Sequence, residues 1–355
     1  MPVPALPIVP PAAIAHATAP AAAVRKTAGM VIYTLTTDGS GDYAAMLRLS
    51  LASLRESNPG RAAVVVCDPP TRRTLERNSD RLLDEADEVL TWETPPGSLE
   101  FRSRFLKTTL RQHLAGPLLY LDTDTLVRGS LAPIFATPAD VAGAANHSRD
   151  TFAEQFWAPD RAALAKLGWE TCPDCYVNAG VLFSNDTPAA KSFYADWHAR
   201  WQESCARLGG FRDQPAFNSA LRAATPGLTF AALPHRFNAQ FRATPQAVAG
   251  AVVWHYYTSG PDTPAIAMQD LVRAISPRQP ISRRAVRRLV RRAWPWRRES
   301  WLDGWVFARL ARTGEIDRYD RLWFAGQRYE AVRKRCYHAW LRWRRGENAC
   351  PPAER

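Results

Sequence analysis

The apolar positions of this sequence fall into two kinds of run, which alternate as far as residue 121. Four short and nearly continuous apolar runs have the length and composition of buried strands, at residues 30–36, 62–67, 88–92 and 118–121. Between them, apolar residues recur at helical spacing in three longer segments, at residues 43–57, 71–83 and 101–114. This alternation predicts an α/β fold, with a mixed, largely parallel sheet flanked by helices.

The pattern continues with a helix at residues 189–208, a second helix that opens at residues 213–218, and three more strands, at residues 140–145, 175–183 and 252–257. Inside one of these strands, Asn178-Ala179-Gly180 predicts either a close approach of the backbone to a ligand or a β-bulge. In the first helix, Phe193, Trp197 and Trp201 recur every four residues, which is most simply explained by core packing. His255 lies in an apolar strand, and alone it indicates a buried core histidine.

Two carboxylates follow the fourth strand directly. Asp122 and Asp124 are spaced i, i+2, so on an extended segment they would point to the same side. They would then meet beyond the carboxyl end of a buried strand, where open α/β sheets bind ligands. Paired carboxylates repel unless a cation lies between them, and Mg²⁺ or Mn²⁺ typically takes one or two carboxylates plus substrate phosphates. The pattern indicates a metal–diphosphate site, although aspartates alone are also common in surface turns.

The composition is that of a globular protein without a membrane span. Of 355 residues, 46% are hydrophobic, and no apolar run reaches the length of a transmembrane helix. The six cysteines are too scattered for a disulfide framework, and Cys172-x-x-Cys175 lacks a second ligand pair for zinc. We therefore expect a reducing, cytoplasmic setting. Residues 1–28 are rich in Ala and Pro, and we expect a disordered tail there.

The net charge of +12 comes from one segment, because residues 273–345 contain 21 basic and 6 acidic residues. The same segment holds seven of the 13 tryptophans. Residues 282–294 repeat two arginines and two apolar residues, which predicts a helix with an arginine face and an apolar face. Two interpretations stay open: an interfacial helix on an anionic membrane surface, or an appendage that packs on the core. We do not expect a nucleic-acid partner, because no known binding module is visible.

Seven motifs gain meaning from their order along the chain. They are Tyr-Thr-Leu-Thr-Thr-Asp at 33–38 with Tyr43, Arg-Phe-Leu-Lys at 104–107, Leu-Tyr-Leu-Asp-Thr-Asp-Thr-Leu-Val at 119–127, Asp-Val-Ala-Gly-Ala at 140–144, Asn-Ala-Gly-Val-Leu-Phe at 178–183, Asp-Gln-Pro-Ala at 213–216 with Asn218, and Trp-His-Tyr at 254–256. Together they resemble the GT-A fold nucleotide-diphospho-sugar transferases, specifically the retaining, glycogenin-like family 8 glycosyltransferases. A glycine and a lysine that follow the last motif in that family are replaced here by Tyr-Thr-Ser-Gly-Pro at 257–261.

The resemblance implies a role for each motif. Asp122, Asp124 and His255 would bind Mn²⁺, or Mg²⁺, and a UDP-sugar would be the donor. The implied donor-binding residues are Leu35, Thr37, Asp38, Tyr43, Arg104, Lys107, Asp122, Thr123, Asp124, Asn178, Ala179, Gly180, Asp213 and Gln214. The implied catalytic residues are Asp213, Gln214 and Asn178.

The sequence thus leads to a hypothesis with three segments, a tail at 1–28, a GT-A domain at 29–262 and a basic helical extension at 273–345. The chain would be a metal-dependent glycosyltransferase that moves a sugar, with retention, from a UDP-sugar to an unknown carbohydrate, lipid-linked or protein acceptor. It would work in the cytoplasm, with the extension able to hold it at the inner membrane face. The alternative is a non-catalytic basic adaptor that binds membrane or nucleic acid through residues 273–345.

Overall fold

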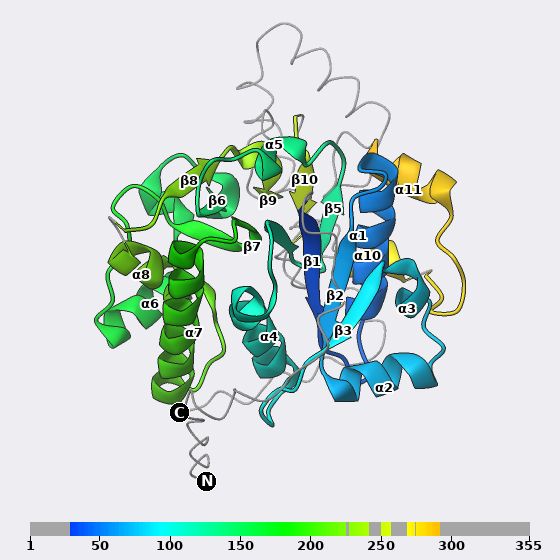
Figure 1. The fold of residues 1–355 in the computed structure, drawn as a ribbon, viewed down its shortest axis with the longest axis horizontal. Helices are drawn as coiled ribbons and strands as arrows, with labels where there is room; N and C mark the ends of the chain where they lie inside the picture. Colours follow the sequence, from blue (N-terminus) through cyan, green and yellow to red (C-terminus); the bar gives the residue numbers. More distant parts are fainter. Residues whose placement is uncertain (1–28, 225–226, 241–249, 257–267, 274, 292–355) are drawn as a thin grey trace, which may run out of the picture.

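A seven-stranded sheet with the strand order β3-β2-β1-β4-β7-β6-β8 forms the centre of the protein (Figure 1). The computed structural model describes residues 29–224, 227–240, 250–256, 268–273 and 275–291. The strands of this sheet are β1 (Met30–Leu35), β2 (Ala63–Cys67), β3 (Glu88–Thr91), β4 (Leu118–Leu121), β6 (Val141–Ala145), β7 (Val177–Ser184) and β8 (Phe230–Leu233). A second sheet has the order β5-β10-β9 and consists of β5 (Thr125–Val127), β9 (Ala239–Gln240) and β10 (Val253–His255).

The strand directions agree with the predicted fold class, which is confirmed as mixed and largely parallel. β1 pairs in parallel with both β2 and β4, and β3 extends the parallel edge through β2. β7 runs antiparallel to its two neighbours, β4 and β6. This reversal places the middle of β7 beside the carboxyl end of β4, because Leu121 is paired with Val181.

Helices cover both faces of the large sheet, and Figure 1 shows α7 and α8 on one side of the molecule and α1 and α11 on the other. The helices are α1 (Tyr43–Ser57), α2 (Pro69–Arg77), α3 (Leu82–Glu85), α4 (Leu99–His113), α5 (Ala132–Phe135), α6 (Ala158–Leu167), α7 (Pro188–Leu208), α8 (Gln214–Ala224), α10 (Met268–Val272) and α11 (Arg283–Val290). Short 3₁₀ turns are η2 (Asn146–Ser148), η3 (Phe152–Gln155) and η4 (His235–Phe237).

The two faces of β1 show how the sheet is buried. Ile32 belongs to the core cluster formed with α4, α7 and α8, whereas Tyr33 belongs to the cluster formed with α1. The aromatic residues of α7 lie in the first cluster, with Trp197 and Trp201 both at 0% exposure, so their predicted role in core packing is confirmed. With apolar residues on both faces, β1 fits the doubly covered sheet that its continuous apolar sequence predicts.

One predicted helix, at residues 71–83, is two helices in the structure. α2 ends before Ser79, whose φ of 51° lies in the left-handed region and is incompatible with a continuing right-handed helix. The side chain of Asp80 then accepts a hydrogen bond of 2.9 Å from the backbone N–H of Leu82, where α3 begins. The sequence prediction missed this break because Ser79 and Asp80 are compatible with helical spacing around them.

The basic segment contributes α11, which packs on α1. Val286 is 2% exposed and belongs to a cluster with Met46 and Leu49 of α1, and Arg287 Nε lies 2.6 Å from Glu56 Oε1. The buried guanidinium of Arg48 also donates to the backbone carbonyls of residues 276, 277 and 279. Of the two interpretations of this segment, core packing therefore describes α11. The rest of the extension and the tail at 1–28 lie outside the described residues.

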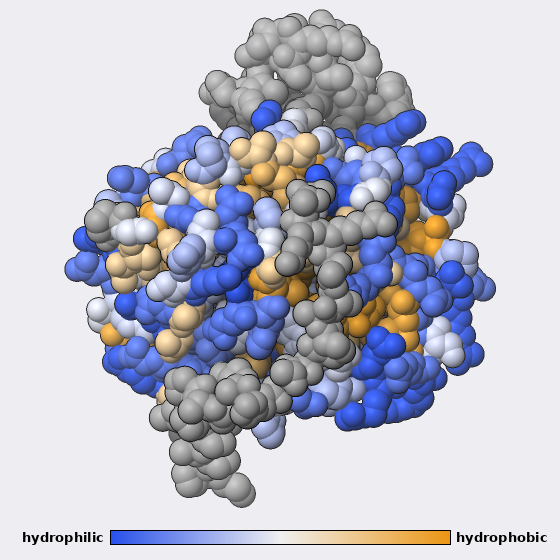
Figure 2. Space-filling view, viewed as in Figure 1, coloured by the Kyte–Doolittle hydropathy of each residue, from blue (hydrophilic) through white to orange (hydrophobic). Residues whose placement is uncertain are grey.

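The described surface is largely polar on the face that Figure 2 shows, with apolar side chains in separate patches, some of them on the side of α1 and α11. No helix in the described part of the chain is both long and apolar enough to cross a membrane.

Candidate active site

The two predicted carboxylates lie in the turn that joins β4 to β5. The backbone there is a turn and not the extended segment that the i, i+2 spacing implied. Two hydrogen bonds hold the turn: the Asp122 N–H donates to the Gly180 carbonyl at 2.8 Å, and the Thr125 hydroxyl donates to the Asp122 carbonyl at 2.9 Å. The turn brings the two side chains together, so the predicted convergence is found although its predicted cause, an extended segment, was wrong.

His255 joins the carboxylates through the small sheet. It lies at the end of β10, where it pairs with Thr125 of β5, one residue beyond Asp124. Its Nε2 lies 3.3 Å from Asp124 Oδ1 and 3.7 Å from Asp122 Oδ2. Ligand atoms of the three residues all lie within 4.8 Å of one another. Two carboxylate oxygens and one imidazole nitrogen suit a divalent cation, and the nitrogen favours Mn²⁺ over Mg²⁺.

Gly180 leaves the space that this cluster needs. A Cβ at residue 180 would lie 2.2 Å from His255 Cε1, 2.6 Å from Asp122 Oδ2 and 2.9 Å from His255 Nε2. These distances are shorter than any non-bonded contact allows, so a side chain here would displace the candidate ligands. Both interpretations of the Asn178-Ala179-Gly180 interruption find support. The pairing of β6 with β7 shifts register between Val177 and Leu182, as at a β-bulge, and the ring and the carboxylate of the cluster lie close to the backbone at Gly180.

Two cations from α4 balance the negative charge. The Lys107 ammonium is 2% exposed and lies 2.8 Å from Asp213 Oδ2 and 3.5 Å from Asp122 Oδ1. The Arg104 guanidinium pairs with Asp213 Oδ1 at 3.1 Å. Burial opposes the ionisation of Asp122, but Lys107, His255, Arg104 and a hydrogen bond from Tyr120 outweigh it and lower the pKa of this carboxyl to about 2. Asp122 is therefore an anion at neutral pH.

Two cavities meet at the carboxylates. The first, of about 470 Å³, lies toward β1 and α1 and is lined by Leu35, Tyr43 and Thr123, among others. The second, of about 290 Å³, lies toward β7 and α8. It is lined by a polar set that includes Lys107, Asn178, Ala179, Gly180, Asp213, Gln214 and His255. Arg104, Asp122 and Asp124 line both cavities. The structure thus gathers most of the residues that the motifs indicated around two connected spaces.

Two predicted donor residues lie outside these spaces. Thr37 and Asp38 line neither cavity: the Thr37 N–H donates to the Thr71 hydroxyl at 2.9 Å, and Asp38 accepts from the Ser40 N–H at 2.8 Å. Residues 257–261, which replace the family's glycine and lysine, lie outside the described part of the chain.

The structure also adds residues that sequence reasoning missed. Asn146, Trp157, Asp160 and Arg212 line the second cavity, and Asn238 contacts His255 from behind. These residues come from segments without a regular apolar period. Trp157 directly precedes α6, and a tryptophan outside the regular apolar pattern was the one sequence feature that could have indicated this part of the site.

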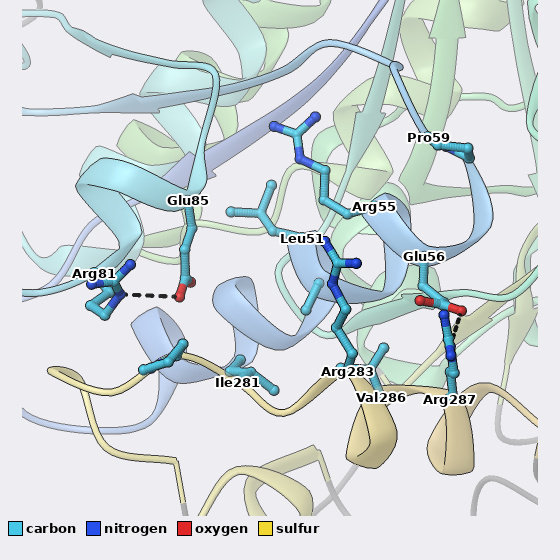
Figure 3. Close-up of a pocket in the computed structure, with 12 residues that line it drawn as sticks. Leu51, Arg55, Glu56, Pro59, Arg81, Glu85, Ile281, Arg283, Val286 and Arg287 are labelled. Carbon is cyan, nitrogen blue, oxygen red and sulfur yellow. Dashed lines mark hydrogen bonds and ion pairs between the residues drawn. The ribbon is translucent and has the colours of Figure 1, made fainter.

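A third cavity, of about 480 Å³, lies away from this cluster, between α1, α3 and α11 (Figure 3). Its charged side chains are largely paired with each other: Arg287 with Glu56 at 2.6 Å and Arg81 with Glu85 at 3.9 Å. The predicted site residues do not line it. The carboxylate cluster, and not this cavity, is therefore the candidate active site.

Residues 105–260 match the model of the family described as "Glycosyl transferase family 8". The matched segment contains Asp122, Asp124, Gln214 and His255. The recognition made from the motifs is confirmed for this segment, which carries the family 8 glycosyltransferase pattern.

The solved structures that match this chain include three glycosyltransferases. The apo structure of the bifunctional glycosyltransferase WbbM is 14% identical, with a TM-score of 0.45, over 66% of this chain and 47% of that chain, so the match spans about half of WbbM. The galactosyltransferase LgtC, solved with donor and acceptor sugar analogs, is 21% identical, with a TM-score of 0.44, over 66% of this chain and 89% of that one. Mouse xyloside xylosyltransferase 1 is 17% identical, with a TM-score of 0.42, over 64% and 97% respectively. No curated protein matches this sequence.

The space beside Gly180 gives a first test of the site. The Gly180→Ala variant should lose most of its affinity for Mn²⁺, because the new Cβ displaces His255 and Asp122. Calorimetric titration of the metal-free protein with Mn²⁺ measures this. The matched control is Gly210→Ala, since a Cβ there would meet no atom within 4 Å. Equal Mn²⁺ affinity in wild type and Gly180→Ala would show that the cluster is not the metal site.

Proposed function

We propose that this protein is a metal-dependent glycosyltransferase that transfers a sugar from a UDP-sugar, with retention of the anomeric configuration. The observation that carries the proposal is the meeting of two cavities at Asp122 and Asp124. A nucleoside fits the first cavity, beside Tyr43, and a sugar fits the second, beside Asn178 and Gln214. The diphosphate would then lie over the carboxylates, where only a bound cation makes its negative charge tolerable.

The candidate metal ligands are Asp122, Asp124 and His255. When bound there, a divalent cation would offset the charge that develops on the leaving nucleoside diphosphate. The chain supplies further positive charge at the same place through Arg104, which lines both cavities and keeps 29% of its side chain exposed. Lys107 is more deeply buried, and its ammonium forms ion pairs with Asp122 and Asp213.

The ion pairs of Asp213 favour a front-face displacement, in which the leaving phosphate guides the acceptor and no covalent intermediate forms on the protein. This carboxylate is the nearest candidate for a nucleophile in a double displacement. Its two oxygens are held by Lys107 and Arg104, at 2.8 and 3.1 Å, and these ion pairs stabilise the anion and weaken it as a nucleophile. Asp213, Gln214 and Asn178 would therefore orient the sugar by hydrogen bonds.

Trp157 indicates where the acceptor would bind. Tyr43 and Trp157 are the two large hydrophobic side chains that stay exposed in the described residues, at 54% and 45%, and each lines one of the two cavities. The guanidinium of Arg212 covers the Trp157 ring at 4.0 Å from its centroid. An exposed aromatic ring at the mouth of a polar cavity suits the apolar face of a sugar ring. We therefore infer a carbohydrate as the acceptor, free or as part of a larger molecule.

Removal of one carboxylate separates this proposal from the non-catalytic adaptor. Asp124→Ala should reduce the release of UDP from a panel of UDP-sugars to background, because the metal site loses a ligand. Asp84→Ala, which removes an exposed carboxylate of α3, should keep the wild-type rate. Wild-type turnover in Asp124→Ala would contradict the proposal. A wild type without turnover on any UDP-sugar would favour the adaptor, which acts through residues 273–345.

The acceptor assignment has its own test. Trp157→Ala should lower the ratio of sugar transfer to donor hydrolysis, measured with a panel of oligosaccharides, by about 2- to 10-fold. That range corresponds to a stacking contact of about 0.5–1.5 kcal/mol. Trp92→Ala, a half-buried tryptophan at the end of β3, serves as the control. An unchanged ratio in Trp157→Ala would place the acceptor elsewhere.

A further inference from the structure

A chain of buried amide side chains lies behind the candidate metal site. Asn238, Asn178 and Asn146 are 0%, 5% and 2% exposed, and His255 is 1% exposed. His255 Nδ1 lies 3.0 Å from Asn238 Oδ1, Asn238 Nδ2 lies 3.0 Å from Asn178 Oδ1, and Asn178 Nδ2 lies 3.0 Å from Asn146 Oδ1. Each link joins one donor to one acceptor, so the direction of every hydrogen bond depends on the orientation of its neighbours.

Backbone groups fix that direction at two points. The N–H of Gly180 can only donate, and it lies 2.9 Å from Asn178 Oδ1. The carbonyl of Gln155 can only accept, and it lies 2.7 Å from Asn146 Nδ2. The first contact places the oxygen of Asn178 toward Gly180. The contact with Gln155 places the amide nitrogen of Asn146 toward Gln155, so the oxygen of Asn146 faces Asn178. This oxygen can only accept, so the amide nitrogen of Asn178 must point toward Asn146, which again leaves the Asn178 oxygen toward Gly180.

A third contact agrees with these two. Asn178 Nδ2 also lies 3.3 Å from Gln214 Oε1, and Gln214 Nε2 lies 3.3 Å from Asp160 Oδ2. A carboxylate accepts hydrogen bonds, so Asp160 orients Gln214 with its oxygen toward Asn178. All three anchors therefore give the Asn178 side chain one orientation, with its oxygen toward Asn238.

The orientation passes from Asn178 to His255. Asn238 must donate to Asn178 Oδ1, because a flipped Asn238 would place two amide oxygens against each other. Asn238 Oδ1 then faces His255 Nδ1, and an amide oxygen accepts only. Nδ1 must carry a proton. In the neutral ring, the lone pair is therefore on Nε2, which faces the oxygens of Asp122 and Asp124 at 3.7 and 3.3 Å.

We propose that Asn238 is a positioning residue that keeps the proton of His255 on Nδ1 and leaves Nε2 ready to bind the metal. This inference rests on the proposed metal-dependent function. The carboxylates alone would favour the opposite tautomer, since an N–H on Nε2 could donate to Asp124. Asn238 opposes this preference, and the backbone N–H of Gly180 supports Asn238 through Asn178. Metal-binding histidines commonly need such a partner on the other ring nitrogen.

The tautomer itself can be measured without any metal. Long-range ¹H–¹⁵N correlation spectra of the full chain, labelled at its histidines and recorded at alkaline pH, distinguish a protonated ring nitrogen from an unprotonated one. The signals of His255 are identified by their loss in His255→Gln. We expect protonated Nδ1 and unprotonated Nε2 in the wild type. A neutral wild-type ring with its proton on Nε2 would overturn the proposal, and this result needs no variant of Asn238.

Two substitutions of similar size then test the role of Asn238. Asn238→Leu removes the acceptor and should move the proton toward Nε2. Asn238→Asp keeps an acceptor for Nδ1–H and should keep the wild-type tautomer. The control is Asn58→Leu, because Asn58 makes two comparable hydrogen bonds, to Leu131 N and Gly129 O, away from the site. An unchanged tautomer in Asn238→Leu would overturn the proposal.

Calorimetric titration with Mn²⁺ completes the test. Asn238→Leu should bind Mn²⁺ about 10- to 100-fold more weakly than the wild type, which is the usual effect of losing such a partner. Asn58→Leu should bind as the wild type does. A changed tautomer with unchanged Mn²⁺ affinity would overturn the positioning role. A wild type with the expected tautomer but without Mn²⁺ binding would instead refute the metal-dependent function on which this role rests.

Discussion

The site depends on holding several negatively charged carboxylates close together. Asp122, Asp124 and Asp213 all line one cavity at the edge of the sheet, and carboxylates in such a place repel each other unless cations separate them. Lys107 lies between two of them and is almost fully buried, and it stays close to both carboxylates. The second pair, Asp122 and Asp124, has His255 beside it and leaves space for a divalent cation. Lys107 thus neutralises part of the negative charge of the site, and a bound divalent cation would neutralise the charge that remains on Asp122 and Asp124.

The sheet topology explains why these groups meet. β4 ends at the carboxylates, and the antiparallel β7 brings Gly180 alongside them. β10 approaches from the small sheet and carries His255 to the same point. Because the ring lies against the backbone of residue 180, the approach depends on the missing side chain of glycine. Asn178 of β7 accepts a hydrogen bond from Asn238, which in turn faces the ring, so the same strand supplies the space for the ring and holds the residue that orients it.

Much of this arrangement could be predicted from the sequence, where the apolar pattern was long or regular. The bounds of α1 are those predicted, because its apolar residues are regular and Asn58-Pro59-Gly60 ends it. The motif order also indicated Asp122, Asp124 and His255, which the structure brings together. Short elements were missed, such as β5 and β9, since two or three residues show no period. Asn238 and Trp157 were missed for a different reason, because their roles arise from contacts between residues that are far apart in the sequence.

In the proposed function, a nucleoside diphosphate and a divalent cation bind together at Asp122 and Asp124. Calorimetric titration of the full chain with UDP, with and without Mn²⁺, tests it most directly, with the Asp122→Ala/Asp124→Ala double variant as the control. We expect UDP to bind only when Mn²⁺ is present, and we expect no binding by the double variant. A folded wild type that fails to bind UDP, or that binds it equally well without metal and in the double variant, would show that the donor does not bind at these carboxylates.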